Sequence, residues 1–429
     1  MRGRIVRPLG GGSGARRGLA PGHDLVSRRR FLAGAGAVLS AAALAPLAGS
    51  PWAEALDVSS RGGSRGFGAR LDDFVRDRMR AAYLTSVTAA AVRGTKLVWS
   101  SGYGLADREQ HRRADPATVY MLASVSKTFI CAAAMQLWEE GSLDLDADVN
   151  RYLWFDVRNP AHPGVKITPR MLLTHTSSIR DRGGLWGTIA KPTPVTGYTV
   201  GDATLPLGAD LSGYLVPGGA SFAPGECYYG YRPGTRYEYS NLGADLAALL
   251  VQTISGTGFG EHVHDRLLRP LGMAESGYHL RNIHTRDLAV PYRYQSATKR
   301  FLPFEQYGYP DYPCGCMRTS AEALSVWLRC FMNGGAIDGE RILKASTVRE
   351  IMRPQVGKIE PGQGLIWYRI HEAGEHLIGH NGGDYGTSTN MYFSPSRGVG
   401  AITLTNRYIG GWNAWYAFLD IQDRLFDLL

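Results

Sequence analysis

A serine and a lysine three positions apart form the first candidate for chemistry in this chain. Ser124 and Lys127 stand at the start of an apolar run that continues to Trp138. On a helix, residues three apart share one face, so the lysine amine would lie beside the serine hydroxyl. A serine hydroxyl becomes a useful nucleophile when a neighbouring base takes its proton, and a desolvated lysine can be that base. Backbone N–H groups at a helix N-terminus could bind the resulting oxyanion, so the pattern predicts acyl transfer.

The same Ser-x-x-Lys pattern occurs a second time, at Ser296 and Lys299. This copy follows Tyr292-Arg293-Tyr294 and has no apolar helix behind it, so we expect a solvated loop. The pattern around Ser124 would by itself fit an ordinary helix start equally well. Two further motifs decide in favour of catalysis.

The two further motifs are Tyr239-Ser240-Asn241 and Gly379-His380-Asn381-Gly382-Gly383. A tyrosine and an asparagine before a helix offer a phenol that can carry a proton and an amide that can bind a carbonyl. A tyrosine that simply packs at a helix start is the alternative for this motif. The glycines of the other motif would let a substrate backbone approach a strand closely. Each motif is weak alone, but an accidental set in this order is improbable.

With these three motifs the chain resembles the serine hydrolases of the class C β-lactamase and penicillin-binding-protein superfamily. The resemblance covers roughly residues 66–429 and extends to Leu172-Leu173-Thr174-His175-Thr176-Ser177 and to Met391-Tyr392-Phe393. It implies a β-lactamase/transpeptidase-like fold. We expect His175 to be a buried histidine that bonds a neighbouring loop.

The resemblance also implies a role for each motif residue. Ser124 would attack the carbonyl, while Lys127 and Tyr239 would share the acid and base work with pKa values that their mutual environment depresses. The remaining residues would hold the substrate: Asn241, His380 and Gly382 as binding residues, and the backbone N–H groups of Ser124 and Gly383 as the oxyanion hole. The resemblance implies no cofactor and no metal.

His380 departs from the pattern of class C β-lactamases, which have a lysine there as a fixed cation for the substrate carboxylate. An ordinary imidazole is mostly neutral near pH 7.5. Family members with histidine at this place include D,D-peptidases and broader esterase- or amidase-like hydrolases. If the substrate does carry a carboxylate, Arg407 is the first candidate for its anchor.

The elements that would position these residues predict an α/β protein of the α+β type. Strand-like runs at both chain ends, with helices between them, indicate one antiparallel sheet flanked by helices and interrupted by a largely helical region. We expect the sheet region at about 67–115 and 334–429 and the helical region at about 116–333. The expected elements are helices at 69–83, 241–255, 259–268, 321–332 and 413–426, a hairpin at 87–92 and 96–99, and strands at 365–370, 376–379, 387–393 and 399–406.

Local signals mark the ends of several of these elements. Thr168 and Pro169 are a helix N-cap and its first residue, and Gly256 is a helix C-cap. The irregular stretch 180–236, rich in Gly, Pro, Tyr and Trp, predicts a binding wall rather than a linker.

The N-terminal part of the chain predicts export. Residues 1–30 carry eight arginines and one aspartate and residues 31–55 add one glutamate, so the net charge of +9 leaves only +3 for the rest, too little to indicate nucleic-acid binding. Ser27-Arg28-Arg29-Arg30-Phe31-Leu32 precedes an Ala- and Gly-rich apolar run, which is typical of a twin-arginine signal. Ala53-Glu54-Ala55 fits a cleavage site. We expect residues 1–55 to be removed, 56–66 to be a linker, 67–429 to be the hydrolase domain, and the mature protein to be periplasmic or secreted without stable membrane insertion.

Five cysteines show no zinc-binding spacing. Cys131 and Cys330 fall in apolar helical runs and should pack as small core residues. Cys227 could form a disulfide with Cys314 or Cys316 in an exported protein.

The sequence therefore predicts an exported serine hydrolase that cleaves a small-molecule ester or amide, or a peptide, through an acyl-enzyme on Ser124. One alternative is a D-alanyl-D-alanine carboxypeptidase or a class C-type β-lactamase. The other is a non-catalytic peptidoglycan-binding sensor on the same fold, against which the intact set Ser124, Lys127 and Tyr239 argues.

Replacing both Arg28 and Arg29 with lysine should trap the precursor in the cytoplasm, because a receptor reads the paired arginines and not merely their charge. Fractionation and immunoblotting of the exported and cytoplasmic pools measure the effect. Normal export of the double variant would contradict the twin-arginine assignment.

Overall fold

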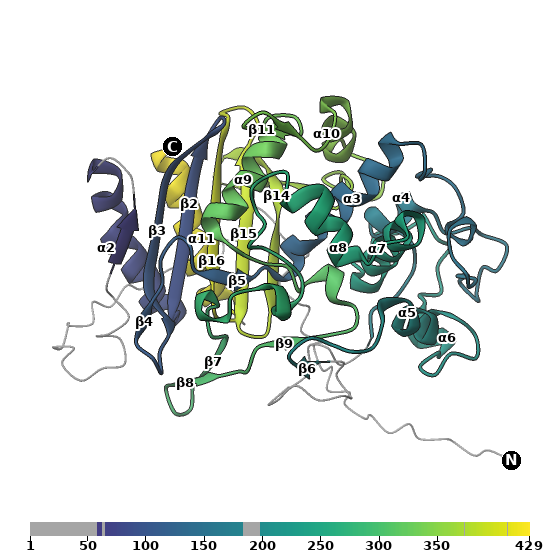
Figure 1. Cartoon of the computed structure of the whole chain (residues 1–429), viewed down its shortest axis with the longest axis horizontal. Helices are drawn as coiled ribbons and strands as arrows, with labels where there is room; N and C mark the ends of the chain where they lie inside the picture. Colours follow the sequence, from purple (N-terminus) through teal and green to yellow (C-terminus); the bar gives the residue numbers. More distant parts are fainter. Residues whose placement is uncertain (1–57, 62–64, 183–197, 373, 410) are drawn as a thin grey trace, which may run out of the picture.

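The computed structural model describes residues 58–61, 65–182, 198–372, 374–409 and 411–429 (Figure 1). The predicted export signal, including Arg28 and Arg29, lies outside the described residues. Both ends of the described chain enter one antiparallel sheet, which confirms the predicted fold class. Its strand order is β1-β3-β2-β16-β15-β14-β13, with the short β4 paired to β3. The strands are β1 (Val58–Arg61), β2 (Ser86–Arg93), β3 (Lys96–Asp107), β4 (Arg112–Arg113), β13 (Tyr368–Glu372), β14 (Glu375–Asp384), β15 (Thr387–Ser394) and β16 (Val399–Thr405).

The two chain ends meet where β2 pairs with β16, with the register running from Val399 opposite Arg93 to Leu404 opposite Thr88. Successive side chains of β2 point to opposite faces of the sheet, and both sets are buried. Ala90 and Val92 belong to the core on the helical side, whereas Val87, Ala89 and Ala91 belong to the core on the outer side. The sheet is therefore the middle layer of the molecule.

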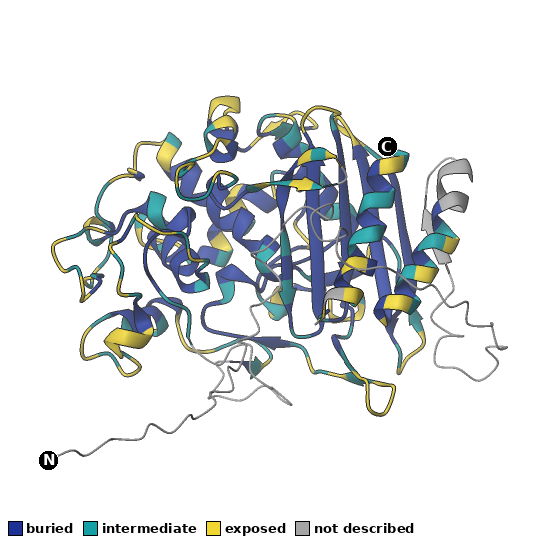
Figure 2. Ribbon diagram, turned by 180° about the vertical axis from the view of Figure 1, so that it is seen from behind, coloured by how far each residue is buried: buried dark blue, intermediate teal, exposed yellow. Residues whose placement is uncertain are grey.

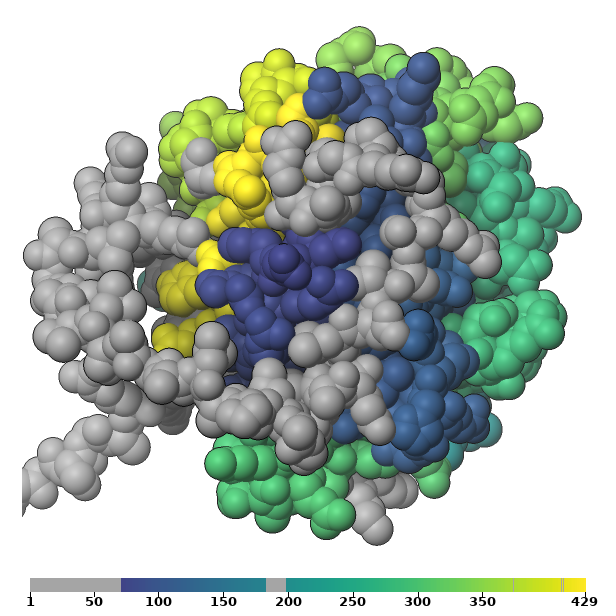
Figure 3. Space-filling model, turned by 90° about the vertical axis from the view of Figure 1, so that its left-hand side faces the viewer, coloured from purple at the N-terminus to yellow at the C-terminus, as the bar shows by residue number. Residues whose placement is uncertain are grey.

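Two helices from opposite chain ends cover the outer face of the sheet. They are α2 (Arg65–Ala82) and α11 (Trp412–Leu428), and they lie side by side (Figure 3). In α2 the buried residues Leu71, Val75 and Met79 recur every four positions, which places them on the face toward the sheet. Figure 2 shows these helices buried toward the strands and exposed on the other side.

The helical region lies against the other face of the sheet (Figure 1). Its helices are α3 (Lys127–Glu139), α4 (Pro169–Leu173), α5 (Leu207–Leu215), α6 (Pro224–Cys227), α7 (Asn241–Ser255), α8 (Phe259–Val263), α9 (Ala321–Met332) and α10 (Ala345–Met352). Small strand pairs join its loops: β5 (Val119–Met121) with β10 (Arg318–Ser320), β6 (Thr199–Val200) with β9 (Tyr307–Gly308), β7 (Tyr292–Gln295) with β8 (Arg300–Pro303), and β11 (Ala336–Ile337) with β12 (Glu340–Arg341). α3 and α7 pack together in the centre of the larger core.

Capping residues explain where several helices begin and end. The Thr168 side chain accepts a hydrogen bond from the Met171 N–H, with Pro169 at the first turn of α4. The Ser240 side chain accepts one from Gly243 N–H at the start of α7. Gly256 ends α7 with a φ of 69°, a left-handed conformation that glycine adopts without a Cβ clash. The predicted N-cap at Thr168, with Pro169 after it, and the predicted C-cap at Gly256 are confirmed.

Other parts of the chain differ from the sequence predictions. The predicted linker 56–66 contains β1, which pairs with β3 from Val58 to Arg61, and α2 begins at Arg65. The stretch 180–236 is not wholly irregular, because it contains α5 and α6. All five cysteines are free and buried, so Cys227 forms no disulfide with Cys314 or Cys316.

No single helix in the described ranges has both the length and the apolar composition to cross a membrane, although α7 and the helical segment after it would satisfy those two criteria as a bent pair.

Candidate active site

Ser124 lies on a short 3₁₀-helix, Ala123–Ser126, that leads directly into α3. Ala123 has a φ of 48°, a left-handed conformation that costs a non-glycine residue on the order of 1–3 kcal/mol. Neighbouring strands hold this bend in place. The Thr387 hydroxyl donates to the Met121 carbonyl at 2.7 Å, and the Thr389 hydroxyl donates to the Leu122 carbonyl at 2.7 Å. The chain is therefore fixed on β15 immediately before the serine.

Lys127 is completely buried, and its amine lies in the centre of the site. Its Nζ donates to Ser124 Oγ at 3.1 Å and to the Cys314 carbonyl at 2.8 Å. The same Nζ lies 5.1 Å from the centroid of the Tyr239 ring. The structure thus brings together the three predicted catalytic side chains, Ser124, Lys127 and Tyr239.

The second motif is held by His175. The Ser240 N–H donates to His175 Nδ1 at 3.2 Å, and the Glu238 N–H donates to the His175 carbonyl at 2.9 Å. The imidazole ring also packs on the Tyr239 ring, with centroids 4.4 Å apart. The predicted structural role of His175, a buried histidine that bonds a neighbouring loop, is confirmed.

Asp181 fixes Asn241, and sequence reasoning did not identify it. Its carboxylate accepts hydrogen bonds from Ser240 Oγ at 3.1 Å, Asn241 N at 3.0 Å, Asn241 Nδ2 at 2.7 Å and Leu242 N at 3.1 Å. A carboxylate at a helix N-terminus is favourable because the first N–H groups there have no partner within the helix. Asp181 follows the Thr176-Ser177 segment of the sequence, but only the fold brings it to α7.

The third motif lies on β14, directly against the Ser124 bend. A Cβ added at Gly382 would lie 2.8 Å from Ser124 N and 2.4 Å from the Leu122 carbonyl oxygen, so only glycine fits there. Gly383 follows on the same strand, opposite Ser388 of β15. The Ser124 amide and the predicted oxyanion-hole strand are therefore neighbours.

His380 is buried, with 2% of its surface exposed. Its Nδ1 lies 2.5 Å from the Asn381 carbonyl, and the Tyr368 ring meets it edge-on with centroids 5.1 Å apart. The centroid of the Tyr239 ring lies 6.4 Å from that of the His380 ring. The histidine predicted to bind substrate thus forms an aromatic wall with Tyr239 and Tyr368.

The charge states of Lys127 and Tyr239 differ from the prediction that both pKa values are depressed. Burial acts to lower the pKa of Lys127, but Tyr239, Cys314 and Asp245 together raise that pKa above its ordinary value. Burial raises the pKa of Tyr239, and the Lys127 charge and the hydrogen bonds with Lys127 and Ser124 offset only part of that rise. The resting site therefore holds an ammonium group beside a neutral phenol.

Arg407 does not serve as the alternative carboxylate anchor suggested by the sequence. Its guanidinium donates to the carbonyls of Ala82 and Tyr83 at the end of α2 and stacks over the Tyr294 ring. Burial lowers the pKa of Arg407 to about 10. The second Ser-x-x-Lys, at Ser296 and Lys299, lies in the exposed turn between β7 and β8, as expected.

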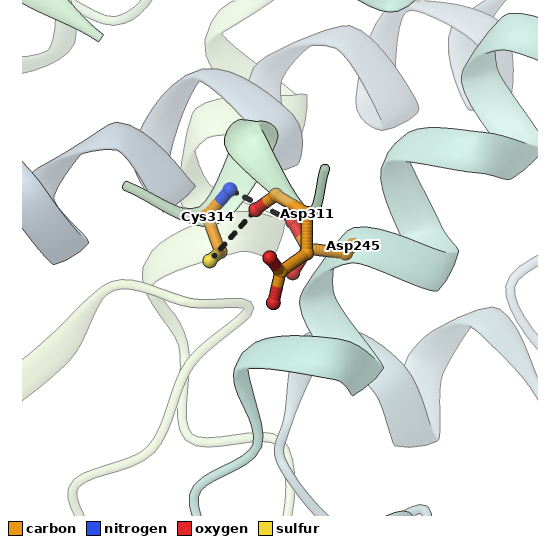
Figure 4. A group of neighbouring side chains, drawn as sticks. All are labelled: Asp245, Asp311 and Cys314. Atoms are coloured by element: carbon orange, nitrogen blue, oxygen red, sulfur yellow. Dashed lines mark hydrogen bonds between the residues drawn. The ribbon is translucent and has the colours of Figure 1, made fainter. Parts of the chain in front are cut away.

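One group among the described residues has the ligand types of a metal site. Asp245, Asp311 and Cys314 are buried, and their potential ligand atoms lie within 4.8 Å of one another (Figure 4). The group adjoins Lys127, because the Lys127 amine donates a hydrogen bond to the Cys314 carbonyl.

Comparison with known proteins gives consistent matches. Residues 71–417 match the family model described as Beta-lactamase. Protein flp of Staphylococcus aureus (strain MRSA252) is 24% identical over 344 residues, which make up 79% of this chain and 62% of that protein. Esterase EstB of Burkholderia gladioli is 29% identical over 251 residues, 56% of this chain and 57% of the esterase. The matched regions thus span about three fifths of these relatives.

Among solved structures, an octameric penicillin-binding protein homologue from Pyrococcus abyssi aligns with a TM-score of 0.66 and 22% identity. The alignment covers 82% of this chain and 76% of the homologue. This likeness shows a shared fold.

The four contacts of Asp181 lead to a prediction about stability. Asp181→Ala should lower the free energy of unfolding by about 2–3 kcal/mol, because hydrogen bonds to charged groups contribute roughly 1.5–3 kcal/mol. Urea unfolding followed by circular dichroism measures the change. Asp73→Ala is the control, because Asp73 forms an exposed ion pair with Arg76 and should matter by less than about 1 kcal/mol. If both substitutions lower the free energy of unfolding equally, Asp181 does not hold the start of α7.

Proposed function

Because the chain belongs to the β-lactamase family, we propose that it is a serine hydrolase that cleaves an ester or amide bond through an acyl-enzyme on Ser124. The observation that carries this proposal is the 3.1 Å contact between Lys127 Nζ and Ser124 Oγ, next to the Tyr239 phenol. In this proposal Ser124 is the nucleophile and the buried Lys127–Tyr239 pair activates it.

The raised pKa values determine how such activation works. With an ammonium and a phenol in the resting site, the pair must lose one proton before it can act as a base. The Lys127 charge stabilises the phenolate form of Tyr239, so Tyr239 is the group that takes the Ser124 proton and passes it to the leaving group. Lys127 keeps its proton and holds Ser124 Oγ in place.

The N–H groups of Ser124 and Gly383 would bind the oxyanion that forms, at about 2.7–4 kcal/mol for each donor. The close approach of Gly382 to Ser124 N supports this assignment. Water then attacks the acyl group, with Tyr239 again moving the proton. Asn241, oriented by Asp181, would bind the substrate carbonyl side.

We further propose that the preferred substrates are esters of neutral acyl groups. Histidine is a poor permanent cation at neutral pH, and at His380 it stands where a class C β-lactamase has lysine. The similarity to Esterase EstB supports an ester substrate. We also propose that the protein acts outside the cytoplasm after twin-arginine export, on the basis of the arginine pair before the apolar run.

Ser124→Ala should reduce hydrolysis of p-nitrophenyl butyrate to the buffer rate while changing the melting temperature little, because the partly exposed hydroxyl supplies chemistry and little packing. Ser296→Ala is the matched control, because it alters the exposed copy of the motif and should keep full turnover. If Ser124→Ala keeps appreciable turnover and Ser296→Ala loses it, the nucleophile has been assigned wrongly. If the unmutated protein hydrolyses none of a panel of esters, amides and peptides, a binding sensor becomes the better proposal.

His380→Lys should shift the ratio of kcat/KM values from p-nitrophenyl butyrate toward a chromogenic cephalosporin. The added charge binds the cephalosporin carboxylate in ground state and transition state alike, so the change should come through KM more than kcat. His376→Lys, at an exposed position on the same strand, should leave the ratio unchanged. Efficient cephalosporin turnover with poor ester turnover by the unmutated protein would instead favour a β-lactamase or a D-alanyl-D-alanine carboxypeptidase.

A further inference from the structure

Asp245 is a completely buried acid one helical turn after Asn241 on α7. Residues four apart lie on one face of a helix, so the two side chains point toward the same region. Asp245 Oδ1 accepts a hydrogen bond from the Cys314 N–H at 2.8 Å (Figure 4). Its other oxygen, Oδ2, is buried and has no hydrogen-bond partner among the described residues. Burying a carboxyl oxygen without a hydrogen-bond partner costs stability.

The backbone of Cys314 connects this acid to Lys127. Its N–H is bound by Asp245, and its carbonyl accepts the 2.8 Å hydrogen bond from Lys127 Nζ. The same Nζ then reaches Ser124 Oγ at 3.1 Å. Asp245 thus fixes a backbone segment that fixes the lysine, and the lysine contacts the nucleophile.

A metal ion is the other explanation for the group formed by Asp245, Asp311 and Cys314. The neighbouring positive charges argue against it. Lys127 interacts with Asp245 and opposes the rise of its pKa that burial causes, and Arg182 Nη1 lies 3.7 Å from Asp311. The Cys314 thiol is also engaged, since it donates to the Asp311 carbonyl at 3.2 Å. Two protein cations, Lys127 and Arg182, therefore already lie near these acids.

We propose that Asp245 is a positioning residue for Lys127, holding the Cys314 backbone so that the lysine amine stays within hydrogen-bond reach of Ser124. The proposal rests on the proposed function of Lys127 and Ser124. We expect the effect on the chemical step, because the two hydrogen bonds of the Cys314 backbone link Asp245 to Lys127.

Two substitutions separate positioning from simple filling of space. Asp245→Asn keeps an oxygen that can accept from the Cys314 N–H, so its kcat for p-nitrophenyl butyrate should stay within about threefold of the unmutated value. Asp245→Leu keeps the volume and loses the acceptor, so kcat should fall about 30-fold with KM changed less than about twofold. If Asp245→Leu does not fold, Asp245→Ala makes the same comparison, with folding checked by melting temperature.

Asp107 provides the matched control. It is also buried, and it accepts a backbone N–H, that of Gln110, at 2.9 Å, with no link to Lys127. Asp107→Leu should lower the melting temperature and leave kcat unchanged. A similar fall in kcat for both leucine variants would assign Asp245 a general structural role and overturn the proposal.

A double-mutant cycle with Lys127→Ala completes the test. If Asp245 acts through Lys127, Asp245→Leu should change the residual kcat of Lys127→Ala by less than about twofold. A full 30-fold loss in that background, or a normal kcat for Asp245→Leu, would overturn the inference. Full activity of Lys127→Ala alone would instead overturn the proposed function, so the two failures can be told apart.

Discussion

A fully buried ammonium group is the constraint on which the site depends. Removing the Lys127 charge from water costs several kcal/mol unless nearby groups replace its hydration. Here the replacement comes from Ser124 on the preceding turn and from distant parts of the chain: Tyr239 before α7, Asp245 within α7, and the Cys314 carbonyl. The site can therefore form only when the helical region has folded around the lysine.

The sheet supplies the second half of the site. The pairing of β2 with β16 brings the two chain ends together, and β14 then lies next but one to β16. This order places Gly382 against Ser124 N, while threonines on β15 hold the preceding residues. The left-handed conformation at Ala123 is tolerated because β15 holds the two residues before it.

The sequence predicted what depends on local patterns. The helix caps at Thr168 and Gly256 act within a few residues, and the β2–β3 hairpin follows from a short turn between apolar runs. It could not predict β1, because Val58–Arg61 has little strand character and pairs only because the edge of β3 is available. The Ser-x-x-Lys spacing predicted the contact between Ser124 and Lys127, and the family resemblance implied that Tyr239 joins them. Asp181, Asp245 and the Cys314 backbone were missed because tertiary contacts alone bring them to the site. The directions of the pKa values were wrong for the same reason, since they depend on the surrounding charges and on burial.

In the proposed reaction, Ser124 carries the acyl group during turnover. Mass spectrometry of the protein, acid-quenched within milliseconds of mixing with p-nitrophenyl butyrate, tests it most directly. We expect one butyryl mass increment per chain, mapped by peptide digestion to Ser124 and absent in Tyr239→Phe, which lacks the proton carrier. Turnover with no adduct at any time point, or an adduct mapped to another residue, would contradict it.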